Sequence, residues 1–159
     1  MRKLCFLLSG SLLAVGCARG QGTAHWTGPG VDERVAGAAT GGWCPASGEV
    51  LLEVSEEDRI AGLSWRGSPL VADSAPLNLP NDADSVGTRA SAAARYVYLD
   101  EVRGYRSVTG VARITSADTL AFSATVEGRL QRVGEQDTVH FIATFDRVPL
   151  TRDETLCRP

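Results

Sequence analysis

Side chains that could carry out chemistry are few in this sequence. The only histidines are His25 and His140, and no Cys-x-x-Cys pair accompanies them, so the ligands of a typical zinc site are not present. No serine or cysteine lies in a recognisable nucleophile motif. Acidic pairs such as Asp100-Glu101 have the composition of turns. The sequence therefore predicts a protein that is not an enzyme and that holds neither a metal ion nor a cofactor.

A partial calcium-binding pattern lies within residues 66–90, which form the longest connection between expected strands. Asp82 and Asp84 match the first and third positions of a calcium loop. Val86 and Ala93 stand at the fifth and twelfth positions, where oxygen ligands are required. We therefore interpret the aspartates as turn formers, and we expect this connection to exchange its amide hydrogens fast and to bind no calcium tightly.

The first residues have the pattern of an export signal. Arg2 and Lys3 precede an apolar run of about 13 residues that ends at Gly16, whereas a transmembrane helix needs roughly 20. A basic start, a short apolar run and small residues before a cleavage point are typical of a secretory signal peptide.

The end of this signal, Ala14-Val15-Gly16-Cys17, resembles the lipobox of bacterial lipoprotein precursors. The resemblance implies cleavage of residues 1–16, acylation of Cys17 and a membrane contact through the N-terminal lipid. Because Ala18 and no aspartate follows Cys17, it also implies the outer membrane of the cell envelope. Ordinary secretion, with cleavage at the same small residues, is the alternative.

The number of cysteines favours acylation. Cys5 is lost with the signal, which leaves Cys17, Cys44 and Cys157 in the exported chain. An odd cysteine in an exported protein needs an explanation, and a lipid on Cys17 supplies one. Cys44 and Cys157 are then expected to form a disulfide that joins the first strand to the end of the chain.

Length and charge limit the function classes. Removal of the signal leaves 143 of 159 residues, enough for one domain. The 16 basic and 19 acidic residues become 14 and 19 without Arg2 and Lys3, a net charge of −5. This acidity argues against nucleic acid as a partner, since phosphates require a concentrated basic surface.

Residues 17–42 are rich in glycine and alanine, and we expect a flexible tether between the lipid and the domain. From residue 43 onward the pattern changes to alternation of apolar and polar side chains. Segments 49–55 and 59–65 predict a hairpin. The expected strands that follow are 93–99, 110–116, 119–130 and 137–148. The sequence therefore predicts one all-β domain over 43–159, an antiparallel sandwich or a partly open barrel of seven or eight strands.

Two further resemblances concern this domain. Gly104-Tyr105, Gly110, Phe122 and Phe145-Asp146-Arg147-Val148-Pro149 resemble the C-terminal half of small secreted bacterial β-lipoproteins of unknown function. This resemblance implies a fold and assigns no functional residue. In addition, Gly41-Gly42-Trp43 is similar to the Gly-x-Trp motif that opens lipocalin barrels.

The sequence thus leads to two expectations about function. The first is a lipid-anchored protein of the cell envelope that binds an unidentified protein or small molecule or has a structural role. The second is a small lipocalin-like barrel that carries an apolar ligand. A carrier needs an interior with room for its ligand, whereas a sandwich fills its interior with side chains.

Overall fold

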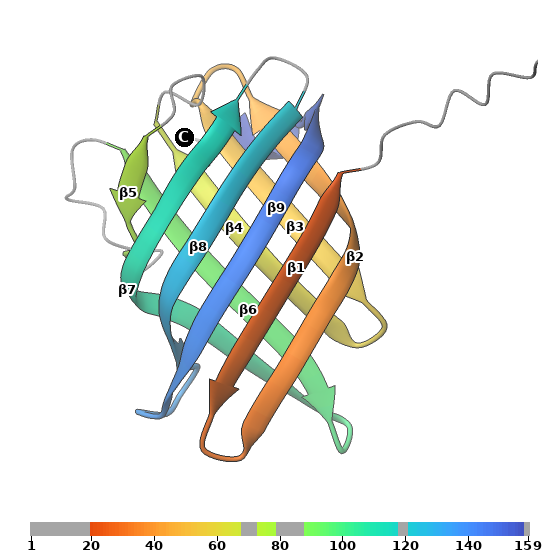
Figure 1. Ribbon diagram of the computed structural model, residues 1–159, viewed down its shortest axis with the longest axis vertical. Helices are drawn as coiled ribbons and strands as arrows, with labels where there is room; N and C mark the ends of the chain where they lie inside the picture. The colour runs from red at the N-terminus through yellow and green to blue at the C-terminus, as the bar shows by residue number, and fades with distance from the viewer. Residues whose placement is uncertain (1–19, 68–72, 79–87, 118–120, 158–159) are drawn as a thin grey trace, which may run out of the picture.

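The computed structural model describes residues 20–67, 73–78, 88–117 and 121–157. Within these ranges the chain forms nine β-strands and one short 3-10 helix (Figure 1). The elements are β1 (Gln21–Gly28), β2 (Val31–Cys44), β3 (Glu49–Glu56), β4 (Arg59–Arg66), β5 (Ser74–Pro76), β6 (Arg89–Tyr98), β7 (Glu101–Ala117), β8 (Ala121–Arg132), β9 (Thr138–Arg152) and η1 (Glu154–Cys157).

Eight of these strands form a closed antiparallel ring. The order around the ring is β1, β2, β3, β4, β6, β7, β8 and β9, and β9 pairs with β1 to close it. Because each ring strand pairs with the next ring strand along the chain, the fold is an up-and-down barrel. The prediction of an all-β antiparallel domain is confirmed. The domain is a barrel and not a sandwich, and the barrel is closed and not partly open.

The barrel has two unlike ends. Four short connections, β1 to β2, β3 to β4, β6 to β7 and β8 to β9, lie at the lower end in Figure 1, which we call the hairpin end. The start of β1 and helix η1 lie at the opposite end, which we call the terminal end.

The predicted tether over residues 17–42 is wrong for its described part, because residues 21–42 belong to β1 and β2. The domain therefore begins near Gln21 and not at residue 43. In β1 the inward positions are Gly22, Ala24 and Trp26, which are buried. Small inward residues are needed here, because a Cβ on Gly22 would lie 2.7 Å from the Cβ of Val54 on β3. Close approach across the barrel thus explains glycines that resemble those of a linker.

The terminal end is closed by two contacts between distant parts of the chain. The last residues of β2 run parallel to the end of β9, with Gly41 opposite Leu150. Cys44, at the end of β2, forms a disulfide with Cys157 in η1, and their Cα atoms lie 5.2 Å apart. The predicted disulfide is therefore present.

The core lies inside the barrel and consists of side chains from alternate strand positions. The predicted inward faces of β8 and β9 are confirmed, since Phe122, Val126, Phe141 and Phe145 are almost fully buried. The outward position predicted for His140 is also confirmed.

β7 changes direction in its middle and joins the two sides of the barrel. Its register with β8 shifts between Ser107 and Thr109, which marks a β-bulge. Gly110 follows at φ +139°, a conformation that favours glycine. A side chain at Gly110 would overlap the backbone of Glu127 and Gly128 on β8. The bend at this glycine lets the first half of β7 pair with β6 and the second half with β5.

Candidate functional site

The inner wall of the barrel combines large aromatic side chains with many alanines. Trp26 and Trp65 are fully buried, and Trp65 of β4 lies opposite Ala90 of β6. The inward positions of β6 before Tyr96 are all short, namely Ala90, Ala92 and Ala94. An eight-stranded barrel is just wide enough to be filled by side chains or to hold one small ligand. Alanine side chains on β6 occupy less of the interior than larger side chains would, which is compatible with the second use.

The indole N–H groups of the buried tryptophans have no hydrogen-bond acceptor. This holds for Nε1 of Trp26, Trp65 and the partly buried Trp43, as judged against the described part of the chain. Most buried donors in native proteins are paired, and leaving one unpaired costs about 1–3 kcal/mol. An acceptor atom within reach of either of these two N–H groups would remove this cost.

A group of aromatic rings lies next to Trp26. The ring centroid of Tyr96 lies 6.4 Å from that of Trp26 and 6.2 Å from that of Tyr105. Burial, together with a hydrogen bond to Tyr96, raises the pKa of Tyr105 to about 12. The Tyr105 hydroxyl therefore keeps its proton at neutral pH and remains a neutral part of this apolar wall.

Ion pairs lie at the hairpin end of the barrel. The Nε of Arg59 lies 2.7 Å from a carboxylate oxygen of Glu33. On the opposite side, Arg132 contacts Glu101 at 3.6 Å and Glu135 at 2.8 Å. These side chains are partly exposed, so each pair contributes little stability, but together they place charge across this end. An apolar ligand would have to cross that charge to enter here.

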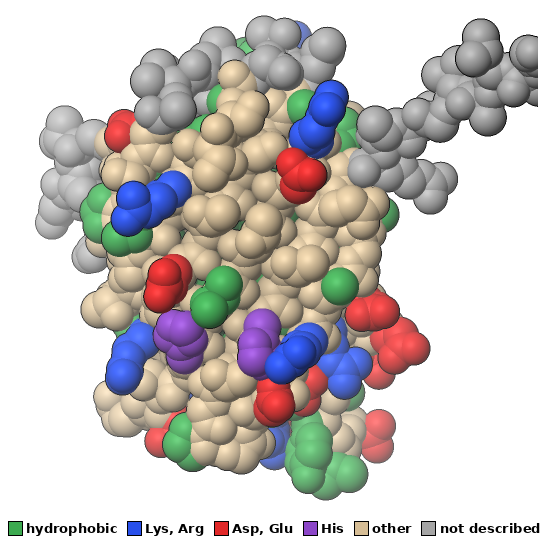
Figure 2. Space-filling model, in the orientation of Figure 1, with side chains coloured by type: hydrophobic (Ala, Val, Ile, Leu, Met, Phe, Trp, Pro, Cys, Tyr) green, Lys and Arg blue, Asp and Glu red, His purple; other side chains and the backbone are tan. Residues whose placement is uncertain are grey.

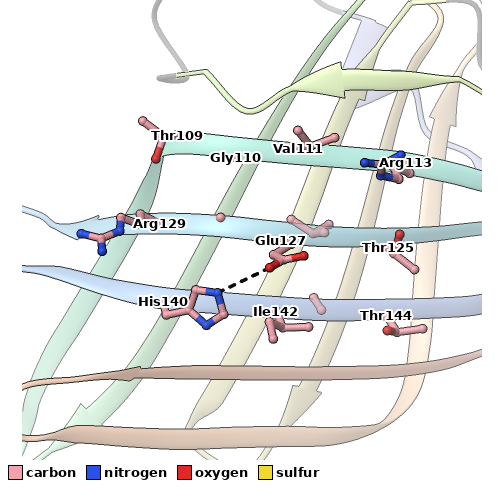
Figure 3. Close-up of a pocket in the computed structure, with 13 residues that line it drawn as sticks. Thr109, Gly110, Val111, Arg113, Thr125, Glu127, Arg129, His140, Ile142 and Thr144 are labelled. Carbon is pink, nitrogen blue, oxygen red and sulfur yellow. Dashed lines mark ion pairs between the residues drawn. The ribbon is translucent and has the colours of Figure 1, made fainter.

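The outer wall carries a hollow of about 500 Å³ over β7, β8 and β9 (Figure 3). The His140 ring is turned toward Glu127 on the neighbouring strand, with 3.8 Å between Nε2 and Oε1. Arg113 and Arg129 lie at the two ends of the hollow. The side chains of His140 and Glu127 are 51% and 77% exposed, so water solvates both groups and their mutual attraction is weak.

Both histidines lie on the outer wall that faces the viewer in Figure 2. His25 is in β1, not in a tether, and its Nε2 lies 2.7 Å from Oδ1 of Asp32. This hydrogen bond lowers the pKa of the Asp32 carboxyl. Throughout the described ranges, no group of three metal-ligating side chains comes together.

The residues predicted from the sequence do not build the interior site. Cys44 and Cys157 are joined at the terminal end, and Cys17 lies outside the described residues, as do Asp82 and Asp84. The interior residues Trp26, Trp65, Tyr96 and Tyr105 were not predicted as a group. Alternation of apolar and polar residues identifies each strand separately. Whether an indole N–H finds an acceptor depends instead on which strands the closed ring places next to it.

Comparison of the chain with protein-family models, with curated proteins and with solved structures found no match. The described residues include no helix long and apolar enough to span a membrane.

Proposed function

We propose that this protein binds a small, largely apolar molecule inside its β-barrel, and that the molecule carries a hydrogen-bond acceptor such as a carbonyl oxygen. The proposal is supported by the buried indole N–H groups of Trp26 and Trp65, which have no acceptor among the described residues. The proposal assigns binding and no catalytic step. It corresponds to the second of the two functions expected from the sequence.

The chemistry of the ligand follows from the inner wall. The alanines of β6 and the rings of Trp26 and Tyr96 offer an apolar surface, which favours an apolar ligand body. An acceptor atom that meets an indole N–H removes the cost of a buried unpaired donor, about 1–3 kcal/mol. The same donor gives no such gain to a pure hydrocarbon, so the site should discriminate between the two.

A matched pair of fluorescent probes tests this discrimination. The naphthyl ketone Prodan has an acceptor oxygen, whereas dimethylaminonaphthalene has the same aromatic body without the ketone. We expect the protein to bind Prodan at least about fivefold more tightly, because one satisfied donor is worth 1 kcal/mol or more. Titration followed by tryptophan and probe fluorescence gives both dissociation constants.

Variants that remove only the N–H assign the effect to the tryptophans. The double variant Trp26→Phe/Trp65→Phe keeps aromatic rings on the wall and should bind both probes with equal affinity. Trp43→Phe is the matched control, because the indole of Trp43 also lacks an acceptor but is only partly buried in β2. Equal affinity of the wild-type protein for the two probes, or no binding of either, would contradict the proposal.

We further propose that the barrel is held at the bacterial cell envelope by acyl chains on Cys17. The support is the lipobox-like Ala14-Val15-Gly16-Cys17 together with the Cys44–Cys157 disulfide, which leaves Cys17 as the odd cysteine of the exported chain. A disulfide also suits the oxidising compartments outside the cytoplasm.

Acylation is tested by the intact mass of protein extracted from membranes. We expect a chain that begins at Cys17 and carries the mass of the acyl groups, and we expect Cys17→Ser to appear in the soluble fraction or as uncleaved precursor. Cys5→Ser is the control, since it changes the signal without changing the cleavage site. Unmodified Cys17 on soluble wild-type protein would refute the anchor.

A further inference from the structure

The wall of the barrel is interrupted between β6 and β7. The ladder that joins these strands runs from Tyr98–Glu101 to Ala93–Arg106 and then stops, because β7 bends away at its bulge. Beyond this point the second half of β7 continues along β8. The upper parts of β6 and β7 are therefore not paired with each other.

The short strand β5 and the two residues after it fill this interruption. β5 lies beside the second half of β7 (Figure 1), and Leu77 and Asn78 continue between the two walls. The Leu77 N–H donates to Gly110 of β7 at 2.9 Å, and the Asn78 N–H donates to Ala90 of β6 at 3.0 Å. One short segment thus replaces the missing contact between two long strands.

Ser107, next to the bulge in β7, forms a hydrogen bond with this segment. Its hydroxyl donates to the Asn78 carbonyl at 2.8 Å and accepts the Ala92 N–H at 3.1 Å. Ser107 is completely buried, so one side chain links β6, β7 and the inserted segment. The hydrogen bond from Ala92 to Ser107 joins β6 to β7 directly and does not depend on the inserted segment. If that segment moved away, β6 and β7 would therefore stay joined at this point.

The inserted segment also separates the interior from the outside. Ala75 and Leu77 are buried, and the Leu77 side chain reaches Gly110 and Gly128, where no side chain competes for the space. Neighbouring strands lie about 4.8 Å apart, so two strands flanking one missing strand are separated by about 10 Å. The edges of that gap carry Ala90, Ala92 and Ala112, which do not obstruct it.

We propose that residues 73–78 form a side gate, through which the ligand passes into the barrel between β6 and β7. This inference rests on the proposed binding function. The segment is suited to opening because β5 is only three residues long, whereas the ring strands have 8 to 17. Short elements open locally at a lower free-energy cost than long strands do. The hairpin end, in contrast, carries ion pairs that an apolar ligand would have to pass.

A disulfide across β5 and β7 tests the gate. Ser74 and Arg113 are directly opposed and exposed, and opposed residues of antiparallel strands have Cα atoms about 4.5–5.5 Å apart, within disulfide range. In the oxidised Ser74→Cys/Arg113→Cys variant, stopped-flow fluorescence should show the association and dissociation of Prodan slowed by about tenfold or more, since a lock removes the open state. The dissociation constant should stay unchanged, because the gate is closed both before and after binding.

The matched control is Thr125→Cys/Thr144→Cys, which places a disulfide between opposed residues of β8 and β9, where the ladder is continuous. Its binding rates should equal those of the wild-type protein. Ser107→Ala should act in the opposite direction and speed association by about tenfold, since it removes one hydrogen bond of the inserted segment.

Amide hydrogen exchange tests the gate without any ligand. The Leu77 and Asn78 amides should exchange by local opening in the wild-type protein and be protected at least about tenfold in the oxidised β5–β7 variant. Wild-type rates of Prodan binding in that variant would refute passage at this gate, whereas an absence of wild-type binding would refute the proposed function. Exchange of Leu77 and Asn78 only by global unfolding would refute the gate in either case.

Discussion

Serine in place of Cys44 is expected to lower the free energy of unfolding by roughly 4–5 kcal/mol. The disulfide joins residues 113 positions apart, and a crosslink restricts the unfolded chain more strongly when it closes a longer loop. Whole domains have net stabilities of about 5–15 kcal/mol, so the loss approaches the entire stability of a marginal fold. Urea unfolding followed by tryptophan fluorescence measures it, because two of the three tryptophans are fully buried.

Cys157→Ser should give the same loss, and the double variant should lose no more than either single variant, since the same crosslink is missing in each. Cys17→Ser is the matched control, because it removes a cysteine that the disulfide does not use, and it should leave the unfolding midpoint unchanged. Two reactive thiols from Cys44 and Cys157 in unfolded, unreduced wild-type protein would contradict the bridge. So would a midpoint that does not change on reduction.

Alanine in place of Gly110 is expected to destabilise the barrel by about 2–5 kcal/mol. At φ +139° the new side chain is strained in its own backbone. It would also overlap the Gly128 Cα and the Glu127 carbonyl oxygen on β8, and would meet the Leu77 side chain. Relief of these overlaps requires β7 to move away from β8 at the point where it turns. Thermal and chemical unfolding measure the loss.

Gly104→Ala is the control on the same strand. A Cβ at Gly104 would meet only the Val133 side chain, at an ordinary contact distance of 3.7 Å. This variant should be neutral or more stable by up to about 1 kcal/mol, because alanine restricts the unfolded chain. Equal stability of the Gly104 and Gly110 variants would show that the bend in β7 does not need glycine.

The sequence predicts the strands whose inward positions carry large apolar side chains. In β8 and β9, Phe122, Val126, Phe141 and Phe145 alternate with polar residues, and this local pattern is sufficient because one face is buried and the other is wet. The β3–β4 hairpin is found for the same reason.

β1 and β2 are missed because most of their inward residues are small. Gly22 and Gly41 face neighbours that come from distant parts of the chain, Val54 in one case and Leu150 in the other. A glycine required by close approach and a glycine in a flexible linker look alike in one sequence, since only the folded partner distinguishes them. The presence of strands at 21–44 thus depends on long-range pairing with β9 and β3.

The interior site and the gate could not be predicted for a related reason. Whether the indole of Trp65 finds an acceptor depends on which side chains of β3 and β6 stand opposite it. The position of β5 likewise follows from the bend at Gly110, which opens a gap that a segment from elsewhere in the chain can fill. Both features arise from ring closure, a property of the whole chain.

The early start of β1 fixes how an acylated protein would stand on a membrane. Only two residues, Ala18 and Arg19, separate Cys17 from Gly20, so the leash is at most about 10–11 Å long even when fully extended. The terminal end would then sit on the lipid headgroups, and the hairpin end would project away from them. The proposed side gate lies in the side wall of the barrel, so a molecule that leaves through it would move parallel to the bilayer surface.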